Sequence, residues 1–173
     1  MEHNTIKILQ WNARSINNKK EDIHNFLCKQ DINLAIITES WLNNTKELNI
    51  PTYNIIRNDR QDGKGGVAIL IKSNITYKII KIHQSTITEP QYSIIQINGI
   101  TIIGIYIPKQ NGSTLQFWEE LINNIQRPFI ILGDLNVHNT HWGSPYTTTE
   151  GDILFNYIQN TDIICLNNAQ PSG

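Results

Sequence analysis

YSIIQINGITIIGIYI, residues 92–107, is the stretch of the 173-residue chain in which strand and turn signals are strongest. Two β-branched runs flank Asn98 and Gly99, and both of these residues tolerate a positive φ, so the stretch predicts a two-residue hairpin between antiparallel strands. Similar apolar runs occupy residues 6–11, 34–38, 54–58, 67–72, 77–82, 129–133 and 162–166. Together with the hairpin they predict about nine strands.

Three other segments change to a helical period, at residues 17–29, 113–125 and 150–160. In the first, Ile23, Phe26 and Leu27 share one face. At the start of the second, Ser113 and Gln116 have the spacing of a capping box. Helices that bracket a strand-rich middle favour an α/β (α+β) fold, with sheets packed together and helices outside.

Composition places the chain among ordinary globular proteins. With 173 residues and 39% apolar content, it predicts one domain over residues 1–173. No apolar run approaches membrane-spanning length, and the first residues lack the layout of a signal peptide, so neither a membrane protein nor a secreted one is expected.

The net charge and the cysteines limit how the protein can bind nucleic acid and which compartment it suits. The net charge of −1 gives no bulk positive field, so any nucleic-acid binding must come from a local site. Cys28 and Cys165 lack the spacing of a zinc finger, and two cysteines do not make a disulfide scaffold, so a reducing compartment is expected.

Polar residues of catalytic type follow several of the apolar runs. They are Asn12, Glu39, Tyr106, Asp134 and Asn136. Each alone also fits a turn, a cap or a half-buried strand position. Strand ends that converge on one rim of a sheet are a frequent place for a ligand site, so the set as a whole favours a site rich in oxygen ligands.

Phosphodiester hydrolysis is the chemistry that uses such a set. Glu39 can hold Mg²⁺, which neutralises charge on the phosphate, and Asp134 can orient or deprotonate a water. The amides and the phenol can donate hydrogen bonds to phosphate oxygens. His138 and His141 are close enough in sequence to Asp134 to supply an imidazole, although histidines in loops are more often solvated.

Six motifs, in order, resemble the endonuclease/exonuclease/phosphatase superfamily, whose fold is DNase I-like. They are LQWNARS (9–15), ITESWL (37–42), RNDR (57–60), GGVAILIK (65–72), GIYIP (104–108) and IILGDLNVHNTHWGS (130–144). TESWL, GKGGVAI and GDLNVHNTHWGS in particular resemble the endonuclease domain of Jockey-like non-LTR retrotransposons. The resemblance spans nearly the whole chain and implies a four-layer sandwich of two mainly antiparallel sheets with outer helices.

Residue by residue, the resemblance implies that Asn12 and Glu39 contribute to the metal and phosphate site. It implies a phosphate-contacting phenol at Tyr106, a water-orienting carboxylate at Asp134 and a phosphate-aligning amide at Asn136. Three further residues in RNDR are implied to support the site: Arg57, Asp59 and Arg60.

The position of His138 matches a frequent histidine of the retroelement members. The implied cofactor is Mg²⁺, with Mn²⁺ as the alternative. The implied partners are a DNA substrate and a reverse transcriptase domain further along the same polyprotein. Action on DNA implies a place in the nucleus after synthesis in the cytoplasm.

One departure from the family pattern leaves alternatives open. Family members end in a Ser-Asp-His motif on a strand, and this tripeptide does not occur in the chain. We therefore expect that roughly the last fifth of the domain, with its last strands, is missing. The alternatives are an inactive remnant that only binds, or another phosphodiesterase such as an abasic-site endonuclease, a sphingomyelinase or an inositol phosphatase.

Overall fold

The structure is a computed structural model that describes residues 5–83, 86–109 and 113–167. In these residues the strands are β1 (Ile8–Asn12), β2 (Leu34–Thr38), β3 (Tyr53–Asn58), β4 (Val67–Lys72), β5 (Lys78–His83), β6 (Gln91–Ile97), β7 (Ile100–Tyr106) and β8 (Phe129–Asp134). The helices are α1 (Lys20–Lys29), α2 (Leu115–Asn123), the 3-10 helix η1 (Thr140–Trp142) and α3 (Thr149–Gln159).

The chain divides into two compact units. The first, Met1–Pro108 with Gln126–Leu135, holds α1 and the eight strands of the described residues. The second, Lys109–Ile125 with Asn136–Gly173, holds α2, η1 and α3. The prediction of one domain over residues 1–173 stays a prediction.

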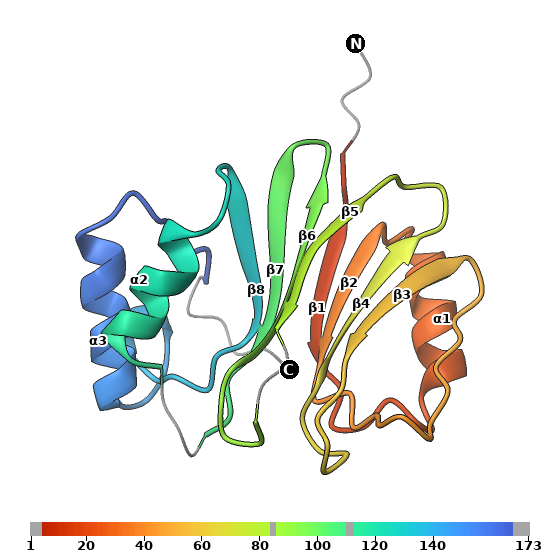
Figure 1. Cartoon of the computed structure of the whole chain (residues 1–173), viewed down its shortest axis with the longest axis horizontal. Coiled ribbons are helices and arrows are strands. Elements are labelled where there is room, and N and C mark those ends of the chain that lie inside the picture. Colours follow the sequence, from red (N-terminus) through yellow and green to blue (C-terminus); the bar gives the residue numbers. More distant parts are fainter. Residues whose placement is uncertain (1–4, 84–85, 110–112, 168–173) are drawn as a thin grey trace. The chain divides into compact units, whose positions relative to one another are not determined.

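The strands of the first unit form two four-stranded sheets (Figure 1). Sheet A has the order β1-β2-β4-β3, and sheet B has the order β5-β6-β7-β8. The pairs β1/β2 and β7/β8 are parallel, and the other neighbours are antiparallel. Both sheets are therefore mixed, with one parallel pair at the edge of each.

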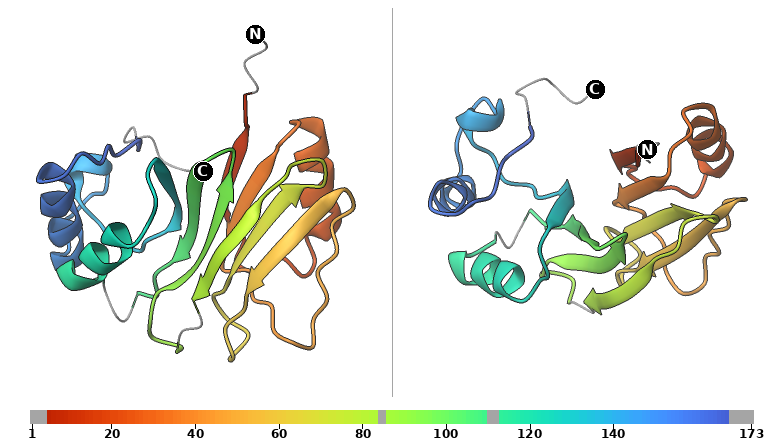
Figure 2. Two further views of the ribbon diagram at one scale, coloured as in Figure 1. Left: turned by 45° about the horizontal axis from the view of Figure 1, so that its top comes forward. Right: turned by 90° about the horizontal axis from the view of Figure 1, so that it is seen from above.

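The two sheets lie face to face (Figure 2). Aliphatic side chains from both sheets pack against each other between them. Ile36 and Ile69 of sheet A lie in the same buried cluster as Ile95 and Ile102 of sheet B. Gly104 allows close approach, because a Cβ at this position would lie 3.2 Å from Ile36 and 3.3 Å from Ile69. This cluster is the main core of the first unit.

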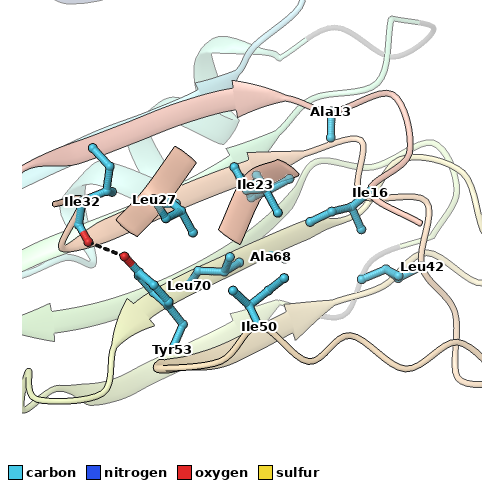
Figure 3. Packing of buried hydrophobic residues seen from close by; sticks show 12 residues of the cluster. Ala13, Ile16, Ile23, Leu27, Ile32, Leu42, Ile50, Tyr53, Ala68 and Leu70 are labelled. Atoms are coloured by element: carbon cyan, nitrogen blue, oxygen red, sulfur yellow. Dashed lines mark hydrogen bonds between the residues drawn. The ribbon is translucent and has the colours of Figure 1, made fainter. Parts of the chain in front are cut away.

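Helix α1 covers the other face of sheet A (Figure 3). Ile23 and Leu27 of the helix pack on Ala68 and Leu70 of β4, while the predicted third member of the helical face, Phe26, is 45% exposed. Strand β2 is buried on both faces and is accordingly apolar from Leu34 to Ile37 instead of alternating.

The predicted α+β class with two facing sheets is confirmed, and so is the hairpin. Ile97 pairs with Ile100 across Asn98 and Gly99, whose φ angles are 50° and 80°. These angles are those of a two-residue turn that follows the twist of the strands. Within the described residues, no helix combines the length and apolar character needed to cross a bilayer.

Two local predictions are wrong. Residues 162–166 form no strand in the described part of the chain, and Ile164 and Leu166 are 79% and 83% exposed. A β-branched run forms a strand only where a neighbouring strand pairs with it. The cap of α2 is Thr114, not Ser113, because the Thr114 hydroxyl accepts the Phe117 N–H at 3.2 Å.

Candidate active site

The ends of the two parallel strand pairs meet at one rim of the first unit. Asn12 ends β1 beside Thr38, the last residue of β2, and Glu39 follows directly. Tyr106 ends β7 beside Asp134, the last residue of β8. A hydrogen bond between Asn12 and Asp134 links these two pairs of strand ends.

The Asn12 amide joins two carboxylates. Its Nδ2 donates to Glu39 Oε1 at 3.0 Å and to Asp134 Oδ2 at 2.6 Å. Its Oδ1 accepts the backbone N–H of Arg14 at 3.2 Å, which fixes the orientation of the amide. The group is partly buried. The carboxylate oxygens of Glu39 and Asp134 are hard donors of the type that Mg²⁺ and Mn²⁺ take, and they are the part of this group that fits a divalent cation. In this structure the Asn12 oxygen is turned to the Arg14 N–H instead.

Glu39 lies in a tight turn with an unusual backbone. Its φ is 48° and that of Trp41 is 53°, a region that non-glycine residues seldom occupy. The carbonyl of Glu39 accepts from Ser15 N at 2.9 Å, and the Trp41 N–H donates to the Gly65 carbonyl at 3.0 Å. The neighbouring loops thus hold the turn and set the position of the carboxylate.

Gly133 determines how β8 reaches Asp134. Its φ is 152°, and a Cβ built on it would lie 1.8 Å from the carbonyl oxygen of Ile105 in β7. Only glycine fits this close approach of two backbones. The glycine of the GDLN motif is therefore required for β8 to pair with β7 up to the carboxylate.

Tyr106 is a buried phenol, only 8% exposed, at the same rim. Burial and then the Glu39 carboxylate raise its pKa, while the guanidinium of Arg60 acts in the opposite direction. Since the net shift is upward from 10, the hydroxyl stays protonated at neutral pH and can donate a hydrogen bond.

The two arginines of the RNDR motif have different partners. Arg60 lies beside Tyr106 and pairs with Asp62 through Nε at 2.7 Å and Nη2 at 2.8 Å. Arg57 pairs with Asp59 and donates to the carbonyls of residues 43 and 46, at 2.8 Å each. Arg57 and Asp59 therefore hold the 43–46 loop, whereas Arg60 lies close to Tyr106 of the rim.

Asn136 and His138 belong to the second unit, so their predicted place beside Asp134 stays a prediction. Asn136 has a φ of 47°. The His138 ring lies 4.8 Å from the Tyr146 ring, and its Nδ1 is 3.4 Å from the Ser144 hydroxyl. The backbone of His138 is fixed by the N–H of Thr148, which donates to its carbonyl at 2.9 Å.

The second candidate histidine, His141, has packing partners of its own. Its ring stacks on Phe155 of α3 at 3.8 Å, and its Nδ1 lies 2.9 Å from Asn139 Oδ1. Asn139 is buried and also donates to Asp152 at 3.2 Å. His141 thus joins η1 to α3, a structural role that distinguishes it from His138.

Sequence reasoning missed two groups near the rim. Asp62 and Gly65 set the place of Arg60, and the GKGG run was the signal for a tight loop. The hydroxyls of Thr38 and Ser40, on either side of Glu39, are buried and have no hydrogen-bond partner among the described residues. No cluster of three or more histidine, cysteine or acidic side chains suited to a metal occurs within the same residues.

The family of the chain is known from its sequence. The sequence profile of the Endonuclease/Exonuclease/phosphatase family matches residues 9–170. The chain belongs to this family. Membership confirms the predicted resemblance and the prediction of a phosphodiesterase or endonuclease type of enzyme.

The most similar curated relatives include retrotransposon proteins. The RNA-directed DNA polymerase from the mobile element jockey of Drosophila melanogaster is 23% identical over 97% of this chain, and that of transposon X-element, from the same species, is 22% identical over 96%. The chain spans 19% of the length of either relative.

Solved structures of low identity share the fold. The endonuclease domain of TRAS1, a telomere-specific non-LTR retrotransposon, has a TM-score of 0.63 and 19% identity, covering 89% of this chain and 71% of that one. An AP endonuclease from Leishmania major has a TM-score of 0.70 and 12% identity, covering 89% of this chain and 66% of that one.

Proposed function

We propose that the chain is the endonuclease domain of a non-LTR retrotransposon, which nicks target DNA so that the released 3′-hydroxyl primes reverse transcription. The observation that carries the proposal is the Asn12 amide, which donates to both the Glu39 and the Asp134 carboxylate. The retrotransposon relatives support the choice of DNA as substrate and a reverse transcriptase domain of the same polyprotein as partner. The protein would act in the nucleus after synthesis in the cytoplasm.

Glu39 and Asn12 would hold a divalent cation, Mg²⁺ or alternatively Mn²⁺. When bound, the cation neutralises charge on the phosphate and stabilises the leaving oxygen. Asp134 accepts a proton from the attacking water, and the hydrogen bond from Asn12 keeps the Asp134 carboxylate in one orientation. Glu39 thus binds the cation, and Asp134 acts on the water.

The remaining residues bind the phosphate. Tyr106 donates its hydroxyl proton to a non-bridging oxygen, which is consistent with a phenol that stays neutral at pH 7. Asn136 aligns the phosphate, as the family resemblance implies, and His138 supplies the imidazole that faces the phosphate. With a net charge of −1, the chain must bind DNA through this local site instead of a broad basic surface.

The test is nicking of supercoiled plasmid by the whole chain in Mg²⁺, with and without a chelator, and by the Glu39→Gln variant. The substitution keeps the size of the side chain and removes its charge, so the rate should fall about 10³-fold. Glu47→Gln is the matched control, because Glu47 is exposed and outside the rim. Its rate should equal that of the unchanged chain.

Three results would overturn the proposal. The first is nicking that persists in chelator, and the second is a Glu39→Gln variant that nicks as fast as Glu47→Gln. The third is a folded chain that binds DNA without nicking it, which is the behaviour of an inactive remnant. A parallel assay on an abasic duplex separates a repair-type substrate from plain DNA.

A further inference from the structure

We propose that Arg60 is a positioning residue that holds the Tyr106 ring in place for its contact with the substrate phosphate. Asp62 and Gly65 fix the guanidinium of Arg60 for this task. The inference rests on the proposed function in one respect, since it takes Tyr106 as the group that contacts phosphate.

The first support is that Tyr106 and Arg60 both approach Gly65 closely. A Cβ at this position would lie 2.9 Å from Cε1 of the Tyr106 ring and 3.2 Å from both Cζ and Nη1 of Arg60. The phenol ring and the guanidinium therefore both lie close to the same point beside Gly65. The φ of Gly65 is 72°, which also favours glycine.

The second support is the rigidity of Arg60. Its Nε and Nη2 pair with the two oxygens of Asp62, and its Nη1 donates to the Ile87 carbonyl at 3.2 Å. A two-pronged pair of this kind fixes the plane of the guanidinium as well as its position. The side chain is 11% exposed, so packing restricts it further. A group held in this way can restrict the ring beside it.

The third support is the charge balance around the phenol. The carboxylates of Glu39, Asp134 and Asp62 all act on Tyr106, and Arg60 is the cation that opposes them in the described part of the chain. A phosphodiester anion that approaches two carboxylates is repelled, and a fixed positive charge beside the phenol offsets part of that repulsion. Arg60 thus keeps the phenol side of the site suitable for an anion.

The chain contains a matched comparison. Arg57 precedes Asp59 by two residues, as Arg60 precedes Asp62, and both pairs are two-pronged. Arg57 donates its remaining bonds to the 43–46 loop. The same local motif thus holds a loop in one case and adjoins Tyr106 in the other.

The experiment is a double-mutant cycle in the full chain. Arg60→Met keeps the length of the side chain and removes its charge and hydrogen bonds, and kcat for plasmid nicking should fall about tenfold with KM changed less than about threefold. Arg60→Lys should recover part of kcat. In the Tyr106→Phe background, Arg60→Met should cost less than about twofold, because the group it positions is gone.

A second readout does not need activity. Tyrosine labelled with ¹³C at Cζ gives one NMR signal per ring, and the signal missing in Tyr106→Phe identifies Tyr106. Arg60→Met should move or broaden that signal, whereas Arg57→Met should leave it in place. If the unchanged chain does not nick DNA, the proposed function fails, and this spectrum still tests whether Arg60 restricts the Tyr106 ring.

Two outcomes would overturn the inference. One is a pair of rate losses that simply multiply, so that Arg60→Met costs as much in the Tyr106→Phe background as in the unchanged chain. The other is a Tyr106 signal that responds equally to Arg60→Met and Arg57→Met, because that result would mean a general loss of structure.

Discussion

The rim of the first unit and the 136–144 loop of the second unit are both rich in polar side chains, but they use them differently. At the rim, Asn12 and Asp134 come from strands far apart in the sequence and bond to each other. In the loop, Asn139 bonds to the N–H of His141 two residues away. Strand pairing brings side chains together from a distance, whereas the loop uses its side chains to satisfy its own backbone.

Each region also depends on one glycine at which two backbones nearly touch. A Cβ on Gly133 would lie 1.8 Å from the Ile105 carbonyl oxygen, and a Cβ on Gly151 would lie 1.9 Å from that of His138. In the first region the contact sets the path of a strand that ends in a carboxylate. In the second region the contact holds the backbone of the loop at His138 against the start of α3.

The largest effect is expected from Gly133→Ala. The new Cβ cannot fit beside β7, so β8 must shift and the Asp134 carboxylate with it, at a cost of more than about 4 kcal/mol in unfolding free energy. Gly99→Ala is the control, because Gly99 has a positive φ of 80° but open space around it. Urea unfolding of both variants checks this, and equal midpoints would contradict the role given to Gly133.

The sequence allowed the strand-end residues to be predicted because strand ends follow directly from local pattern. Apolar runs locate the strands, and Asn12, Glu39, Tyr106 and Asp134 follow from where those runs stop. Parallel pairing then brings Asn12 beside Thr38 and Tyr106 beside Asp134, and the packing of the two sheets brings both pairs to one rim. These side chains and the facing sheets were therefore within reach of sequence reasoning.

Other features depend on tertiary partners and could not be predicted. Arg57 and Arg60 have the same spacing to an aspartate, so the sequence cannot tell which one faces Tyr106. The direction of Arg60 depends on the Ile87 carbonyl, which belongs to the loop between β5 and β6. The 162–166 run reads as a strand, but a strand also needs a neighbour to pair with.

A second prediction tests whether the hydrogen bonds that join the strand ends at the rim are needed for nicking. Asn12→Ala removes the amide that joins Glu39 to Asp134, so the two carboxylates lose a common donor and the nicking rate should fall about 100-fold. Asn54→Ala, at an exposed position of β3, is the control. Plasmid nicking measures the rates, and similar rates for the two variants would remove Asn12 from the site.

A third prediction separates the two histidines of the loop. His141→Ala removes the ring that stacks on Phe155, so unfolding free energy should fall by about 1–2 kcal/mol. His138→Ala should instead lower the nicking rate about tenfold, because its proposed contact is with the phosphate. Thermal unfolding and nicking of both variants check this, and the reverse pattern would exchange the two roles.

The smallest expected effect comes from comparing two buried phenols. Tyr53 donates its hydroxyl to the Ile32 carbonyl at 2.6 Å (Figure 3). Tyr106 instead lies at the rim. Tyr53→Phe should lower unfolding free energy by about 1 kcal/mol and leave nicking unchanged. Tyr106→Phe should lower nicking with little change in stability.

The pH dependence of Tyr53 sharpens this comparison. Burial raises the pKa of Tyr53 above 10, so the folded state favours the neutral phenol. The stability from this preference is complete below the unfolded pKa of about 10 and is lost as pH rises through the higher folded value. In urea unfolding, the advantage of the unchanged chain over Tyr53→Phe should therefore shrink above pH 10. A constant advantage from pH 7 to pH 11 would mean that the Tyr53 hydroxyl is not bonded in its neutral form.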